Sequence, residues 1–215
     1  PLNHGFDEYF GLPYSNDMWP VHFDGTPMTE GRKSFYPKLP LIEGNEVLDY
    51  VENLDQQGLL TTRYTERAVQ FIENNKHQPF FLYLPHSMVH VPLGVSDKFK
   101  GKSEQGMYGD VMMEVDWSVG QILEAIKQNN LDENTLVIFT SDHGEALGDH
   151  GLLLKGCRFY EGLIRVPLIF SWPGQIQAGL VSNALVELTD ITPTLLEIRG
   201  LPVPERMQGR SLLPL

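Results

Sequence analysis

The sequence predicts an α/β fold, with helices flanking a largely parallel or mixed central sheet. Short apolar runs at residues 80–84, 135–140 and 166–171 are typical of buried strands. Longer segments with helical periodicity alternate with these runs, which is the order expected of an α/β protein. The 215 residues, 41% of them hydrophobic, can bury one substantial core. A single domain is therefore the simplest organisation that we expect.

The first half of the chain begins with loops. Residues 1–60 are rich in Gly, Pro, Asn and Asp, which predicts ordered irregular structure with a short hairpin at 40–51. A helix is expected from Thr61, where apolar side chains recur at helical spacing until the polar residues 74–76. Residues 80–84, bounded by prolines, are predicted to form a buried strand.

The second half contains the clearest helical pattern, at residues 107–126. Its apolar positions on one face are Met107, Val111, Val115, Val119, Ile122 and Ile126. Residues 135–140 are apolar and β-branched, as in a central parallel strand, and Pro167 places the strand at 166–171 beside a sheet edge. A last helix is expected from residues 189–190 to Ile198.

Charge and composition exclude several classes of protein. The formal net charge is −12 and no basic patch is apparent, so we expect no nucleic-acid partner. The sequence contains no stretch of 18 apolar residues, which a membrane span would need, and the single cysteine, Cys157, allows no internal disulfide. An acidic surface does not attract an anionic substrate, so a site for one needs a local group of lysines, histidines or metal ligands.

The first candidate site follows the predicted strand at 135–140. Asp142-His143-Gly144 lies where ligands collect in open α/β sheets, beyond the carboxyl end of a strand. A chain bent at Gly144 lets the carboxylate and the imidazole turn toward one ion. Taken alone, the tripeptide is more often a turn or a helix cap.

The neighbouring residues strengthen the prediction of a metal site. Asp149, His150 and Lys155 follow within fourteen residues of Asp142, together with Glu145. A cation and a lysine in one place can neutralise an anionic substrate group.

A second candidate site contains two histidines, His86 and His90, directly after the predicted strand at 80–84. A histidine there can donate a proton to a leaving oxygen or accept one from a nucleophile. On this segment alone, two loop histidines bonded to backbone carbonyls remain the simpler interpretation.

Several segments resemble, in order along the chain, the type I sulfatases of the alkaline phosphatase superfamily, and among them the arylsulfatase A-like members. The similar segments are residues 4–17, 79–92, 109–120, 136–173 and 202–215. The resemblance implies an alkaline phosphatase-like fold.

The resemblance also implies roles for individual residues. Asp142 and His143 match metal ligands, and His90 matches the catalytic histidine. Lys155 matches a catalytic, sulfate-binding lysine, and His150 is a further candidate for substrate binding. His86 matches a residue near the site in some relatives and ranks below them.

The sequence departs from the family pattern at the nucleophile. No Cys/Ser-x-Pro-x-Arg motif, from which the family makes formylglycine, occurs in residues 1–215, and Cys157 lies in a different context. The resemblance therefore implies that residues 1–215 are the middle and C-terminal part of a sulfatase catalytic domain. Formylglycine and further aspartate ligands are expected upstream of residue 1, the C-terminal subdomain is expected to be absent, and this part alone is expected to be inactive.

The implied activity is that of a sulfuric ester hydrolase, which releases sulfate from an aryl or carbohydrate sulfate. Ca²⁺ is the first choice of metal, although the imidazole of His143 also suits Mn²⁺ or Zn²⁺. A phosphodiester or phosphonate hydrolase of the same superfamily and a non-catalytic relative that binds sulfated glycans remain alternatives. The family implies a small-molecule or glycan sulfate ester as substrate, no membrane partner, and a periplasmic, secreted or lysosomal location.

Overall fold

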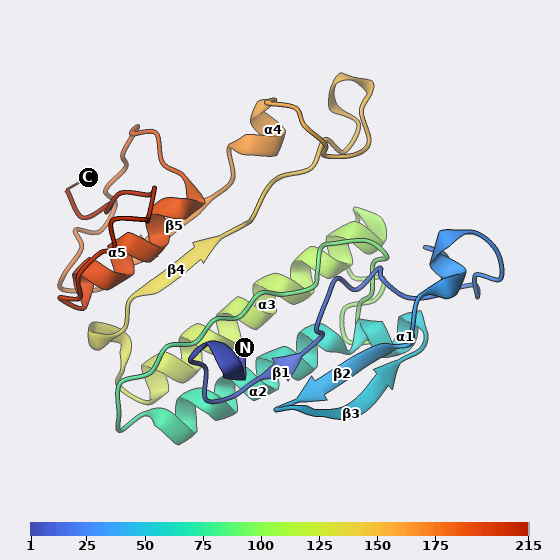
Figure 1. The fold of residues 1–215 in the computed structure, drawn as a ribbon, viewed down its shortest axis with the longest axis horizontal. Coiled ribbons are helices and arrows are strands. Elements are labelled where there is room, and N and C mark those ends of the chain that lie inside the picture. The colour runs from blue at the N-terminus through green and yellow to red at the C-terminus, as the bar shows by residue number, and fades with distance from the viewer. Residues whose placement is uncertain (215) are drawn as a thin grey trace. The chain divides into compact units, whose positions relative to one another are not determined.

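The computed structural model describes residues 1–214. They form two compact units, Pro1–Leu131 and Asp132–Leu215, and each unit is described by itself. Both units combine helices with β-structure, which confirms the predicted α/β class (Figure 1). No helix within the described range is both long and apolar enough to cross a membrane.

The first unit contains a three-stranded antiparallel sheet. Its strands, in spatial order, are β1 (Phe10–Gly11), β2 (Leu39–Glu43) and β3 (Glu46–Val51). Gly44, with a φ of 63°, helps to form the tight turn between β2 and β3. The hairpin predicted at 40–51 is therefore confirmed. The inner face of this sheet joins a core cluster of buried side chains: Trp19, Val21, Leu39, Leu41, Val51, Leu60 and Tyr64.

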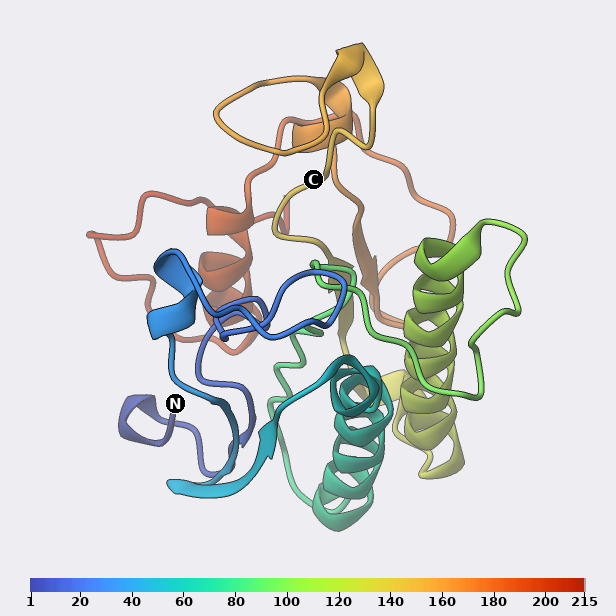
Figure 2. The same ribbon diagram turned by 90° about the vertical axis from the view of Figure 1, so that its right-hand side faces the viewer.

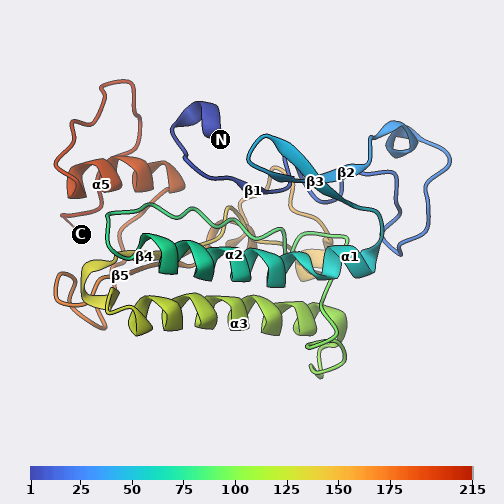
Figure 3. The same cartoon turned by 90° about the horizontal axis from the view of Figure 1, so that it is seen from below.

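Three helices complete the first unit: α1 (Leu54–Gly58), α2 (Leu60–Asn75) and α3 (Gly106–Gln128). Helices α2 and α3 lie side by side and run in the same direction, and the chain between them passes back along them (Figures 2 and 3). Buried polar groups join the pair, because Thr65 Oγ1 and Ser118 Oγ are hydrogen-bonded at 2.6 Å. Both long helices predicted from periodicity are confirmed.

Residues 80–84 form no strand in the described chain, contrary to the prediction. Phe81 and Tyr83 are largely exposed, and the Phe80 ring packs edge-on against Phe71 of α2 at 5.7 Å. The segment is extended but pairs with none of the strands found in residues 1–214. Phe80 thus contacts the side chain of Phe71 on α2, and the backbone hydrogen bonds expected with a neighbouring strand are not found in residues 1–214.

The second unit contains β4 (Val137–Thr140), β5 (Leu168–Ser171), α4 (Glu161–Ile164) and α5 (Ile191–Ile198). The predicted strands and the last helix are confirmed in position. The strands pair antiparallel, so the parallel neighbours expected for β4 are not found among residues 1–214. The reason is that the chain between the two strands turns back through a loop and α4, so β5 returns in the opposite direction.

Candidate active site

The imidazole of His90 is oriented by its own loop. Its Nδ1 lies 2.7 Å from the carbonyl oxygen of Val91. A carbonyl can only accept a hydrogen bond, so Nδ1 carries a proton. The other ring nitrogen, Nε2, is therefore the atom left to give or take a proton.

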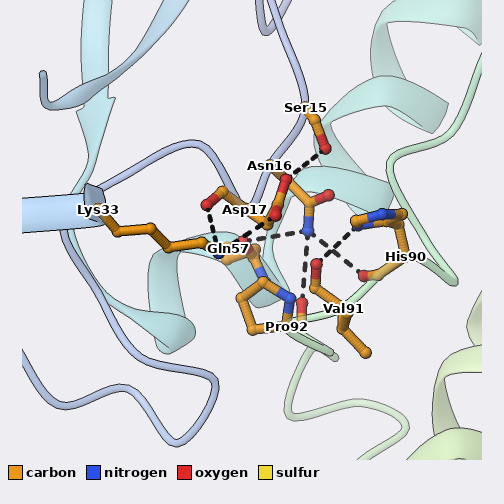
Figure 4. Close-up of polar contacts among 8 residues, drawn as sticks. All are labelled: Ser15, Asn16, Asp17, Lys33, Gln57, His90, Val91 and Pro92. Atoms are coloured by element: carbon orange, nitrogen blue, oxygen red, sulfur yellow. Dashed lines mark hydrogen bonds and ion pairs between the residues drawn. The ribbon is translucent and has the colours of Figure 1, made fainter. Parts of the chain in front are cut away.

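Two buried carboxamides contact the backbone of this loop (Figure 4). Asn16 Nδ2 lies 3.3 Å from His90 O and 3.4 Å from Pro92 O. Gln57 Nε2 donates to Pro92 O, and Gln57 Oε1 lies 3.4 Å from Asn16 Nδ2. Sequence reasoning did not select Asn16 or Gln57, because both occur in polar, loop-like segments where nothing indicates burial.

An ion pair lies beside the carboxamides. Lys33 Nζ is 3.1 Å from Asp17 Oδ2 and 3.0 Å from Asp17 O, and Ser15 Oγ donates to Asp17 Oδ1 at 2.7 Å (Figure 4). Partial burial by itself raises the pKa of Asp17. The hydrogen bonds from Ser15 and Lys33, with the charges of Lys33 and His90, outweigh burial and hold that pKa below its ordinary value.

His86 differs from His90 in its surroundings. Its Nε2 lies 3.1 Å from Ser118 Oγ on α3, and its buried Nδ1 has no hydrogen-bond partner within residues 1–214. Burial lowers the pKa of His86 to about 4, so this ring is neutral at pH 7. A half-buried ring that is neutral at pH 7 is poorly suited to donating a proton to a leaving oxygen.

In the second unit, Asp142 and His143 lie together directly after β4. Asp142 Oδ2 is 3.3 Å from His143 Nε2, and both side chains are exposed. Gly144 sits close to α4: its amide donates to Leu163 O at 2.8 Å, and a Cβ here would be 1.8 Å from Gly162 O. Close backbone packing, rather than the flexibility inferred from sequence, is what requires glycine at position 144.

The Asp142–His143 pair is suited to part of a cation site. His143 Nδ1 lies 2.8 Å from Gly144 O, so this nitrogen carries a proton, and Nε2 is the nitrogen available to a metal. In the neutral ring the Nε2 lone pair faces a carboxylate oxygen, an arrangement that a cation between them would stabilise. No group of three His, Cys, Asp or Glu ligands occurs in the described part of the chain, so the pair supplies two ligands only.

His150 and Lys155 lie in the loop beyond this pair. The His150 ring stacks on Tyr160 with centroids 4.0 Å apart, and both residues line a pocket of about 280 Å³ beside Asp149 and Glu161. Lys155 is half-buried and forms no ion pair within residues 1–214. The side chains of Asp142 and His143 thus contact each other. His86 and His90 belong to the first unit, and Asp142, His143, His150 and Lys155 to the second.

Comparisons with known proteins agree with the resemblance. A family model described as Sulfatase matches residues 1–201. Human arylsulfatase D is 43% identical over 70% of this chain and 28% of its own length. Human N-acetylgalactosamine-6-sulfatase is 36% identical over 100% of this chain and 42% of its own length. The chain thus spans less than half the length of these curated relatives.

Solved structures show the same relationship. The PsFucS1 sulfatase from Pseudoalteromonas sp. is 29% identical, with a TM-score of 0.82 over 99% of this chain and 47% of that one. Ps i-CgsB in complex with k-i-k-neocarrahexaose is 27% identical, with a TM-score of 0.75 over 100% of this chain and 50% of that one. The alkaline phosphatase-like fold is thereby confirmed for this partial domain, and the chain belongs to the sulfatase family.

Proposed function

We propose that the intact protein containing this chain hydrolyses sulfate esters, R–O–SO₃⁻, to an alcohol or phenol and sulfate. The family match over residues 1–201 carries this proposal. Relatives named as arylsulfatase and N-acetylgalactosamine-6-sulfatase suggest aryl or carbohydrate sulfates as the substrate class. A neighbour solved in complex with k-i-k-neocarrahexaose supports a glycan as one form of substrate.

His90 is the proposed general acid of the reaction. Its Nδ1 is committed to Val91 O, so Nε2 is the nitrogen from which a proton would pass to the departing oxygen. Such protonation contributes about 10²–10⁴-fold to rates in other enzymes. It matters most when the leaving alcohol is a poor leaving group, because more charge then builds up on its oxygen.

Neutralisation of the sulfate's charge is assigned to the loop after β4. Lys155 is the proposed catalytic cation that holds the sulfonyl oxygens, with His150 as a further substrate-binding group. Asp142 and His143 would hold a divalent metal, which would supply additional positive charge there. Calcium is the first choice by family, while the imidazole of His143 also suits manganese or zinc.

The nucleophile is the part of the proposal that residues 1–215 do not contain. No Cys/Ser-x-Pro-x-Arg motif occurs in this sequence. In the intact protein, a formylglycine made from such a motif outside residues 1–215 would supply the nucleophile. Cys157 is exposed but lacks that context. We place residues 1–215 in the middle and C-terminal part of the catalytic domain, and the protein in the periplasm, the lysosome or outside the cell.

A phosphodiester or phosphonate hydrolase is the second candidate function. The observation that favours it is the imidazole at position 143, because Asp-His pairs with zinc or manganese suit phosphoryl transfer. It would use the same fold and the same pair of metal ligands.

Turnover of a sulfate ester and of a phosphodiester by the intact protein separates the two functions. We expect 4-nitrophenyl sulfate to be hydrolysed faster than bis(4-nitrophenyl) phosphate under the same metal conditions. The His90→Ala variant should lower turnover of phenyl sulfate, whose leaving oxygen is more basic, by about 10²–10⁴-fold. His77→Ala, at an exposed position after α2, is the matched control and should leave turnover unchanged.

Phosphodiester turnover equal to or greater than sulfate turnover would overturn the sulfatase proposal. Binding of a sulfated glycan without turnover of either ester would instead indicate a non-catalytic relative, particularly if no nucleophile motif precedes residue 1.

A further inference from the structure

The two buried carboxamides beside the His90 loop have no role in the proposed function so far. Asn16 is 2% exposed, and Gln57 is 0% exposed. They come from different parts of the first unit, Asn16 from the loop after β1 and Gln57 from α1. Burying an amide is unfavourable unless its hydrogen bonds are made, so the partners of these groups show what holds them there.

The orientation of each amide follows from its neighbours. Every group near Asn16 Nδ2 is an oxygen acceptor, namely the carbonyls of His90 and Pro92 and the Oε1 of Gln57, so the nitrogen must face them. Gln57 in turn directs its nitrogen at Pro92 O. The two side chains therefore act as one connected pair of donors to the loop.

The carbonyls that receive these bonds flank the one that orients the catalytic imidazole. His90 O and Pro92 O lie on either side of Val91, whose own carbonyl accepts from His90 Nδ1 at 2.7 Å. Each peptide unit is planar, so fixing the carbonyls of residues 90 and 92 restricts the plane between them as well. The direction of Val91 O, and with it the direction of the imidazole, is thereby limited.

A close contact between backbones supports this arrangement independently. A Cβ at Gly58 would lie 2.6 Å from Val95 O, and a Cβ at Gly94 would lie 2.8 Å from Gly58 N. Only glycine at both positions lets the end of α1 rest directly on the chain that follows Pro92. This contact is what brings Gln57, the residue before Gly58, within reach of Pro92 O.

We propose that Asn16 and Gln57 are positioning residues for His90. They fix the backbone of residues 90–92 so that Val91 O holds the imidazole with Nε2 directed for proton transfer. This inference rests on the proposed function, because it takes His90 to be the group that protonates the leaving oxygen.

Misplacement of an acid has a kinetic signature that simple destabilisation lacks. Proton transfer requires heavy atoms within about 2.6–3.2 Å, so a less restrained imidazole slows the step that depends on it. Phenyl sulfate has a more basic leaving oxygen than 4-nitrophenyl sulfate and needs the proton more. A positioning defect should therefore slow the first substrate selectively, while a loss of folded protein slows both equally.

The test is a double-mutant cycle in the intact protein. Asn16→Ala and Gln57→Met each remove the donors without adding charge. We expect kcat for phenyl sulfate to fall by about 10- to 100-fold with KM unchanged, and kcat for 4-nitrophenyl sulfate to change much less. In a His90→Ala background, neither substitution should lower phenyl sulfate turnover further.

Asn129→Ala is the matched control, because it removes an amide donor from Ala125 O at the end of α3 (2.8 Å) without touching the loop. Melting temperatures identify a variant that fails to fold. If Asn16→Ala fails to fold, the test relies on Gln57→Met. Equal losses of kcat with both sulfates, or the same loss with and without His90, would overturn this inference but not the proposed acid role of His90. If His90→Ala itself leaves phenyl sulfate turnover unchanged, the acid role of His90 fails, and this inference fails with it.

Discussion

The two loops that carry the predicted site residues are held in different ways. In the first unit, the backbone around His90 receives hydrogen bonds from two buried side chains that are distant in sequence. Asn16 lies 74 and 76 residues from its partners His90 and Pro92, and Gln57 lies 35 residues from Pro92. In the second unit, Asp142 and His143 are exposed, and their polar contacts are with each other and with adjacent residues. The His90 loop is held by side chains from distant segments, whereas the polar contacts of the Asp142 and His143 side chains within residues 1–214 are local.

The difference separates two ways of preparing a site. Proton transfer depends on distance and angle, so a proton donor benefits from a rigid backbone that is complete before substrate arrives. A cation attracts its ligands from several directions, so a metal loop can gain much of its order from the ion itself. We therefore expect the His90 loop to be ordered without ligand and the Asp142 loop to become more ordered with metal.

Metal binding should give the largest effect and provides the sharpest test of this contrast. At a metal concentration about 100 times its Kd, stabilisation of about 2.7 kcal/mol is expected, which corresponds to a roughly hundredfold smaller population of the locally open state and to correspondingly slower hydrogen exchange. Hydrogen exchange measured with Ca²⁺ or Mn²⁺ and with a chelator should show this slowing at residues 141–152. Exchange at residues 88–96 should not change.

Asp142→Ala should abolish the metal effect, and Asp149→Ala, which removes a carboxylate from the same loop, should retain it. Equal slowing in both loops, or none in the Asp142 loop, would contradict the contrast.

Removal of a buried acceptor behind the His90 loop should give an effect of intermediate size. Glu114 on α3 is fully buried and accepts from Ser96 N and Thr62 Oγ1, both at 2.9 Å. Glu114→Gln replaces one carboxylate oxygen with an amide nitrogen, which cannot accept the hydrogen bond that this oxygen now receives. The substitution should lower the free energy of unfolding by about 1–3 kcal/mol. Urea denaturation measures the change.

Glu124→Gln is the comparison, since Glu124 is exposed on the same helix, and its effect should stay within about 0.5 kcal/mol. Similar small effects at both positions would show that the polar contacts behind the loop contribute little to its order.

The Asp17–Lys33 pair should give the smallest effect, and a pH-dependent one. The pKa of Asp17 is lower in the folded protein than its ordinary value of 3.8, so the unfolded chain binds a proton more readily. Its contribution to stability is therefore complete above that ordinary value and disappears as pH falls through the folded pKa. Asp17→Asn should cost less than about 1 kcal/mol at pH 7.

Denaturant unfolding at pH 7 and at successively lower pH gives the measurement, with Asp116→Asn at an exposed position of α3 as the control. A difference between wild type and Asp17→Asn that grows in acid would contradict the assignment.

Much of the fold was predictable because its signals are local. The periodicity of α2 and α3, the composition of β4 and β5, and the turn between β2 and β3 all lie within short windows of sequence. The segment at 80–84 has the composition of a strand and the same local signal. It fails as a strand in residues 1–214 because pairing depends on a neighbour, and no local pattern reports one.

The sequence by itself determined the α/β class, the family, and the candidates His90, Asp142, His143, His150 and Lys155, whose roles stay predictions. These follow from side-chain chemistry and spacing along one chain. Only the tertiary structure distinguished the neutral, half-buried His86 from the oriented His90 and revealed the contacts of Asn16 and Gln57 with the His90 loop. The physical reason is that burial and long-range hydrogen bonds arise when distant segments meet, whereas a residue's position in sequence records only its neighbours.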